Sequence, residues 1–281
     1  MFNGMFRTSL KLVQPSIFNV AKLISPQNML GHYNKIMSNH ILHQQFEVSP
    51  TVVTVDKSQM LDLSSVVGEE PKLRMGLATK AGLALPYFPI SHSAVCFHEK
   101  SLDKFVVLGR QSPIGLSINN WHLTTKIDDE KSYLSDGYKF NANMTDAMFS
   151  LDEVKQMLNE SNNKINEAQP CDMIGSNCYS SSVYMMAHGL ELITERSERP
   201  SLDYVVSIIR VLTSTAQDNL SIGVLNNDVI TAKVANSLTS AKNFIKDEVT
   251  AEHGSSFSLL KYIDEHIESL ESNSDYKNNS I

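Results

Sequence analysis

The sequence predicts an α+β protein, in which a small antiparallel sheet packs on a helix that begins near Cys178, with further helices after it. Three observations indicate this class. A clear hairpin pattern occupies residues 92–111, a capped helical pattern begins at Ser150, and three apolar stripes with helical spacing follow residue 200. Because the strands come first and the helices later, the order is typical of α+β folds.

The strands are predicted in the first half of the chain. In "HSAVCFHEKSLDKFVVLGRQ", two β-rich runs flank a polar turn, and pairing His98 with Phe105 sets the register of the hairpin. Residues 121–127 and 137–143 are further predicted strands. These segments supply the predicted sheet.

The helices are predicted from caps and periodicity. Ser150 and Glu153 form a capping-box pattern before an apolar helical repeat. Gly175, Ser176 and Asn177 are turn and cap residues, and helical spacing starts directly after them. The later stripes are apolar on one face and indicate core helices: Leu202, Val205, Ile209 and Leu212; Ile230, Val234, Leu238, Ala241 and Ile245; Leu260, Ile263, Ile267 and Leu270.

Composition limits the function classes. The chain has 281 residues, of which 42% are hydrophobic and 20% charged, and a net charge of -7. These values indicate a globular protein and argue against a general nucleic-acid binder. Three cysteines do not make a disulfide framework and suit a reducing compartment. No apolar run reaches the ~20 residues of a membrane span, so no integral membrane association is expected.

The two ends differ from the middle. Residues 1–46 contain no Asp or Glu and carry basic residues among apolar ones, which is the composition of a targeting or secretion leader or of a basic N-terminal arm. The acidic end after Asp264 suits a solvated helix, and it also resembles the glutamate-rich signals of type IV secretion effectors. The ends therefore favour a protein secreted by a bacterium into a host cell, and otherwise a cytoplasmic one.

Cys178 is the candidate nucleophile. At the first turn of a helix, unpaired backbone N–H groups favour a thiolate and can also receive an oxyanion. The alternative is that Cys178 fills the core as a small apolar residue. Cys171 lies before the turn and Cys96 lies within a strand, so both are interpreted as structural.

His92 is the preferred base among the nine histidines. His188 is ten residues along the same helix, roughly 15 Å from Cys178, and is too distant. His98 lies on the same strand face as His92 but about 20 Å away and beside the turn, where exposure is expected. In the register that pairs His98 with Phe105, His92 faces Gln111, which could orient the imidazole or be an exposed strand-end amide. A slip of one residue would bring Arg110 there instead.

The segments "SHSAV" and, far downstream, "MIGSNCYSSSVYM" resemble the permuted papain-like cysteine hydrolases. These include the NlpC-type permuted, lecithin:retinol acyltransferase-like and desumoylating isopeptidase families, in which the histidine strand precedes the cysteine helix. The resemblance covers about residues 87–195 and implies that Cys178 and His92 are catalytic. Ser180 and Ser181 stand where the family often has His-Phe, which is a departure.

The resemblance implies a catalytic core at 47–198, between the arm at 1–46 and a helical region at 199–281. It implies a thiol-dependent hydrolase or acyl transferase without a cofactor, acting on a protein or lipid substrate such as a ubiquitin-like protein. Neither a metal-ligand pattern nor a phosphate loop occurs in the sequence. Two alternatives remain open: a non-catalytic helical interaction module, and a papain-order protease that pairs Cys178 with His253.

Overall fold

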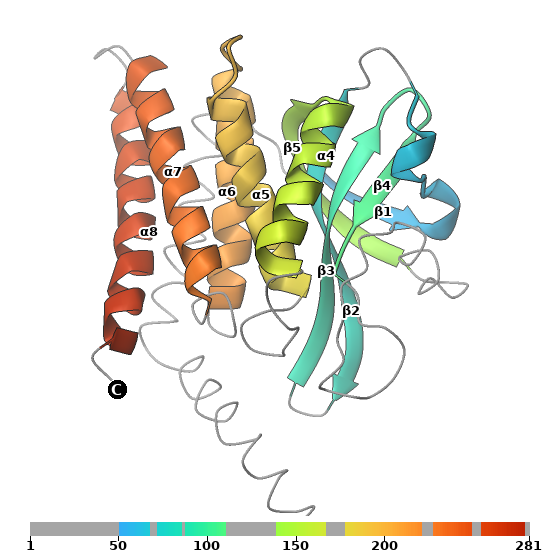
Figure 1. Cartoon of the computed structure of the whole chain (residues 1–281), viewed down its shortest axis with the longest axis horizontal. Helices are drawn as coiled ribbons and strands as arrows, with labels where there is room; N and C mark the ends of the chain where they lie inside the picture. Colours follow the sequence, from blue (N-terminus) through green and yellow to red (C-terminus); the bar gives the residue numbers. More distant parts are fainter. Residues whose placement is uncertain are drawn as a thin grey trace, which may run out of the picture.

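A computed structural model describes residues 51–67, 72–85, 88–110, 139–166, 178–220, 227–248 and 254–278. Within them, the protein is α+β, with a curled antiparallel sheet on one side and helices on the other (Figure 1). The predicted fold class is therefore confirmed at this level.

The sheet has five strands in the order β1-β5-β2-β3-β4. In chain order, the strands are β1 (Thr51–Asp56), β2 (Leu73–Leu85), β3 (Phe88–Glu99), β4 (Lys104–Leu108) and β5 (Lys139–Phe149). Every neighbouring pair is antiparallel. The edges are β1 and β4, and the central strand is β2.

The hairpin prediction is confirmed, including its register. His98 pairs with Phe105 across β3 and β4, and the turn lies between Glu99 and Lys104. The Glu99 carboxylate accepts hydrogen bonds from the Ser101 hydroxyl (2.7 Å) and from the Leu102 N–H (2.7 Å). Asp103 closes the turn with a φ of 49°, a left-handed conformation that Asp tolerates better than most residues.

Two strands, β1 and β2, were not predicted from the sequence. β2 has the sequence "LRMGLATKAGLAL", whose Gly, Ala and Lys residues are weak strand formers. It forms because it pairs with β3 on one side and β5 on the other. The predicted strand at 137–143 is part of β5, whereas the one at 121–127 lies outside the described residues.

The helices follow in sequence after β5. They are α4 (Leu151–Ser161), a π-helical turn (Asn162–Asn166), α5 (Cys178–Thr194), α6 (Leu202–Leu220), α7 (Asp228–Glu248) and α8 (Gly254–Asn278). The predicted capping box is present, because the Ser150 hydroxyl accepts from the Glu153 N–H and the Glu153 carboxylate accepts from the Ser150 N–H. The three later apolar stripes each occupy the buried side of α6, α7 or α8.

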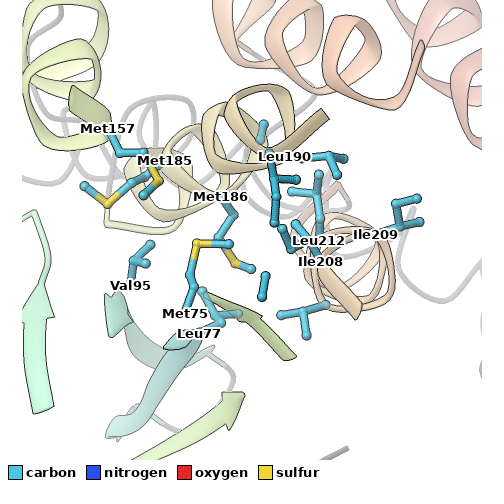
Figure 2. Close-up of a cluster of buried hydrophobic side chains, with 14 of the residues drawn as sticks. Met75, Leu77, Val95, Met157, Met185, Met186, Leu190, Ile208, Ile209 and Leu212 are labelled. Carbon is cyan, nitrogen blue, oxygen red and sulfur yellow. The ribbon is translucent and has the colours of Figure 1, made fainter. Parts of the chain in front are cut away.

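Each face of the sheet carries a cluster of buried apolar side chains. Odd-numbered residues of β2 and β3, such as Met75, Leu77 and Val95, join the helices in the main core. Figure 2 shows these side chains converging with Met186 of α5 and Leu212 of α6. The opposite face carries a second, smaller cluster: Val55, Met60, Ala78, Ala94, Cys96, Phe105, Val107, Phe140, Ala142 and Met144.

The main core continues through the helical half of the chain. It includes buried residues of α6, α7 and α8, and α8 lies at the side of the molecule farthest from the sheet (Figure 1). Tyr262 of α8 donates a hydrogen bond to the Thr213 hydroxyl of α6 (2.9 Å). The predicted boundaries at residues 46 and 198 stay predictions.

Candidate functional site

Cys178 is the first residue of α5, and its side chain is half-buried. A side chain in the first turn of a helix lies near the positive end of the helix dipole, which favours a thiolate. The Ser182 hydroxyl donates a hydrogen bond to the carbonyl oxygen of Cys178 (2.8 Å), which anchors this first turn. The described part of α5 therefore begins with a thiol, and the role of Cys178 as a nucleophile stays a prediction.

The first turns of α5 pack against the end of α4 through polar contacts. The hydroxyls of Ser161 and Ser181 lie 3.3 Å apart, and the Tyr184 hydroxyl donates to the Glu160 carboxylate (3.1 Å). Burial raises the pKa of Tyr184, and Glu160 raises it further, so the phenol stays protonated and serves as a donor. These contacts connect the first turns of α5 to the end of α4.

Cys96 has the opposite environment. It is fully buried in the second cluster, and its thiol lies 3.6 Å from the Met144 sulfur. Burial raises the pKa of the Cys96 thiol to about 12, so the thiolate is absent at neutral pH. Of the two cysteines that the structure describes, only Cys178 is open to solvent, whereas Cys171 lies outside the described residues.

His92 lies in β3, where its backbone pairs with Lys80 of β2; only its backbone is described. The β2–β3 pairing is continuous from Ser91 to Glu99, so position 92 belongs to the even-numbered series. The described even-numbered residues Ala94 and Cys96 face the second cluster, not α5. The pairing of His92 with Cys178 stays a prediction, and this register is the observation that speaks against it.

The other sequence-derived site residues have mixed outcomes. His98 was expected to be exposed, but its side chain is only 21% exposed, because it stacks on the cross-strand Phe105 ring at 4.5 Å. Its Nε2 lies 2.9 Å from the Asp103 carboxylate. Gln111 and His253 both lie outside the described residues, so the orienting role of the one and the papain-order pairing of the other stay predictions.

A partly buried polar cluster further along α5 was not predicted from the sequence. Lys233 of α7 donates to His188 Nδ1 (3.0 Å) and also to the Glu191 carboxylate. His188 Nδ1 also lies 3.3 Å from the Glu191 carboxylate, so the three side chains contact one another. The spacing of Tyr184, His188 and Glu191 on one face of α5 could have revealed this cluster.

Glu191 is ionised in this cluster. Burial raises the pKa of its carboxyl, but hydrogen bonds from His188 and Lys233, together with the charge of Lys233, outweigh burial and lower the pKa. The Lys233 ammonium also lies 5.4 Å from the centre of the Tyr184 ring. The cluster therefore ties α5 to α7, and His188 is engaged there, away from Cys178.

A polar surface cavity of about 550 Å³ lies at the other end of α5, beside α7. It is lined by Thr194, Glu195, Arg196, Ser197, Arg199, Ser240, Asn243, Phe244 and Asp247. Both arginines are already paired, Arg196 with Glu153 and Arg199 with Glu248. The 17-residue length of α5 puts Cys178 roughly 25 Å from this cavity. The cavity is therefore separate from the thiol.

Comparison with known proteins defines no family for this α+β architecture. No protein-family model matches the chain, and neither a curated protein nor a solved structure matches it significantly. Among the described helices, none is long and apolar enough to span a membrane.

Proposed function

We propose that the protein is a thiol-dependent hydrolase or acyl transferase that uses Cys178 to attack an amide, isopeptide or ester carbonyl. The observation that carries this proposal is the half-buried thiol on the first residue of α5, a helix of 17 residues. A helix start supplies both a preference for the thiolate and N–H donors for an oxyanion.

The reaction proceeds in two steps. The Cys178 thiolate attacks the carbonyl carbon, and backbone N–H groups at the start of α5 stabilise the oxygen that becomes negative. A general base, His92 in this proposal, takes the thiol proton and returns it to the leaving amine or alcohol. Water or an acceptor amine then attacks the thioester and releases Cys178.

The substrate class follows from the resemblance in the sequence. The permuted papain-like hydrolases that "MIGSNCYSSSVYM" resembles act on proteins or lipids, so a protein, a lipid or a ubiquitin-like protein is the proposed substrate. The acid-free N-terminal region and the acidic C-terminal end support delivery from a bacterium into a host cell as the proposed setting.

A second candidate is a non-catalytic interaction module, and two observations favour it. The first turns of α5 after Cys178 are closely covered, since Ser180, Ser181 and Ser182 are all buried. The even-numbered register of position 92 places it with residues that face away from α5. In this second candidate, Cys178 is the first residue of a core helix and performs no chemistry.

The experiment compares thiol reactivity in the native protein. Iodoacetamide at pH 6, followed by peptide mass spectrometry, should modify Cys178 before Cys96 and Cys171, because only a thiolate reacts at a useful rate. Cys178→Ser serves as the control for site assignment. Equal and slow labelling of all three cysteines would contradict the enzymatic proposal and support the interaction module.

Histidine variants then identify the base. His92→Ala should slow the alkylation of Cys178 and lower turnover by roughly 10²–10⁴, and Gln111→Ala should have a smaller effect. His98→Ala should have little effect, since His98 is held by Asp103. If His253→Ala slows the alkylation of Cys178 and His92→Ala does not, the papain order replaces the permuted one.

A panel of ubiquitin and lipid activity probes would then report which type of bond the protein cleaves.

A further inference from the structure

The two edges of the sheet are protected differently. Beside β4, Met60 forms a parallel bridge with Phe105, and the Leu61 N–H donates to the Phe105 carbonyl (2.7 Å). The Lys104 ammonium also donates to the carbonyl of Ser58. The chain between β1 and β2 therefore covers the β4 edge, which is a common protection against strand pairing.

The β1 edge lacks such protection within the described part of the chain. There, β1 pairs only with β5, through residues Thr51 to Asp56. Its first five residues, "TVVTV", are all β-branched and include no charge, proline or glycine. An edge of this composition presents backbone N–H and C=O groups on a strand that is well suited to further pairing.

The side chains of β1 cover the second cluster only in part. Val55 is buried in the second cluster, whereas Val53, on the same face, packs against that cluster but is only partly buried. On the other face, Val52 is 66% exposed and Thr54 is exposed. The second cluster is thus partly open at its β1 margin, where one more strand would cover it.

We infer that β1 is a self-association edge, at which a second copy of this chain adds its own β1 in antiparallel orientation. Antiparallel strands related by a two-fold axis have that axis perpendicular to the sheet, so residues that lie opposite each other are on the same face. With Val53 on the axis, Val52 faces Thr54 of the second copy and Thr51 faces Val55. The sheets of the two copies then become continuous, and the partly open cluster continues across the axis.

The register is selected by charge. Moving the axis by one residue, to Thr54, would place Asp56 of each copy opposite Val52 of the other, and it would draw a charged residue of low strand propensity into the pairing. The pairing centred on Val53 uses only β-branched residues from Thr51 to Val55. A single short strand buries less surface than a stable dimer of standard size. The dimer should therefore be weak, with a dissociation constant on the order of 10–100 μM.

The test uses the full-length chain in analytical ultracentrifugation from 1 to 300 μM, with a pair of matched variants. Val52→Lys places two like charges diagonally across the axis, on an exposed position that does not contribute to the core. Val67→Lys makes the same substitution at a position that is 89% exposed and outside the sheet. The wild-type chain and Val67→Lys should dimerise alike, and Val52→Lys should raise the dissociation constant at least tenfold.

Hydrogen exchange separates the remaining outcomes. Amides of residues 51–56 that face away from β5 should be protected at high concentration and exchange faster on dilution. A monomer at every concentration would overturn the inference, and protection of these amides that does not depend on concentration would show that the edge is covered within one chain. A dimer that Val52→Lys leaves intact would place the interface elsewhere and would also overturn it.

Discussion

Gly76 in β2 shows how tightly single residues are fitted into the sheet. A Cβ atom built at Gly76 would overlap the Met144 sulfur and lie 3.1 Å from the Asn143 carbonyl oxygen. The methionine could rotate, but the backbone oxygen belongs to the neighbouring strand β5 and has no room to move. Only glycine lets β2 and β5 approach in this way.

We predict that Gly76→Ala lowers the free energy of unfolding by about 1–3 kcal/mol, the usual cost of overpacking. Gly189→Ala in α5 is the matched control. Its new Cβ would meet side-chain atoms of two methionines: the Met157 sulfur at 3.0 Å, and the Met75 sulfur and methyl carbon at 3.2 and 3.3 Å. Alanine has a higher helix propensity than glycine, which should stabilise the folded protein by about 1 kcal/mol at this position. Urea unfolding should show a larger loss for Gly76→Ala, and equal losses would contradict the backbone argument.

Glu191 leads to a prediction about pH. Its pKa is lowered from 4.5 in the folded protein, so it contributes stability above pH 4.5 that is lost as the pH falls through the folded value. Glu191→Gln should therefore cost about 1–3 kcal/mol at pH 7, as expected for a charged hydrogen bond that is mostly covered. The cost should shrink as the pH falls from 4.5 through the lowered folded pKa, because the wild-type carboxyl then becomes protonated as well.

Chemical unfolding of both proteins at pH 7 and pH 3 measures this difference. Glu265→Gln is the control, because Glu265 is 58% exposed and its ion pair with Lys261 is 3.9 Å long. That substitution should change stability by less than about 0.5 kcal/mol. A cost of Glu191→Gln that is the same at both pH values would show that lost packing, not charge, is responsible.

At the scale of elements, Arg196 joins the end of α5 to the start of α4. Its guanidinium donates to both carboxylate oxygens of Glu153 (2.7 and 2.8 Å) and to the Met148 carbonyl (2.7 Å). It also lies over the Phe149 ring, 5.3 Å from its centre. Since Glu153 is a member of the capping box, one arginine fixes the α4 start, the β5 end and the segment after α5 together.

We predict that Arg196→Lys destabilises the protein by about 1–2 kcal/mol, because an ammonium group lacks the planar fork that contacts two oxygens and a ring. Lys155→Ala should have almost no effect, since its pair with Asp152 is 3.9 Å long and largely exposed. Thermal unfolding of the two variants makes the comparison. Equal stability of Arg196→Lys and wild type would mean that the fork geometry is not needed.

At the scale of the whole molecule, the core does not stop where the predicted helical region begins. Val205, Val206 and Ile208 of α6 are fully buried in the same cluster as the sheet and α5. The Ser207 hydroxyl of α6 also accepts a hydrogen bond from the Asp146 N–H of β5 (2.9 Å). Helix α6 thus covers part of the sheet directly.

We predict that a fragment ending at residue 198 does not fold, because removing α6 to α8 would expose the main core on one side. Removal of residues 1–40 should leave a folded protein, since the described core is formed by residues after 50. Circular dichroism and thermal melting of both truncations provide the measurement. A folded 47–198 fragment would support an independent N-terminal unit, and a large loss of stability without residues 1–40 would make the arm structural.

The α+β class, the hairpin register, the α4 capping box and the three helical stripes could be predicted from the sequence alone. Each depends on local signals: alternation, caps, turn residues and helical spacing within a short window. The register at His98 and Phe105 is of this kind, because a short turn leaves little freedom in how two adjacent strands pair.

Only the tertiary structure decided the rest. Strand β2 has weak strand propensity and forms because two neighbours pair with it, which no local window contains. The Lys233 contact with His188 and Glu191 joins residues more than 40 positions apart. Likewise, the sequence predicted that His92 and His98 share a strand face, but which face of the sheet α5 covers is set by long-range packing. For this reason, the sequence could single out Cys178 as a candidate thiol from local cap signals, whereas a partner for it depends on long-range packing that no local signal contains.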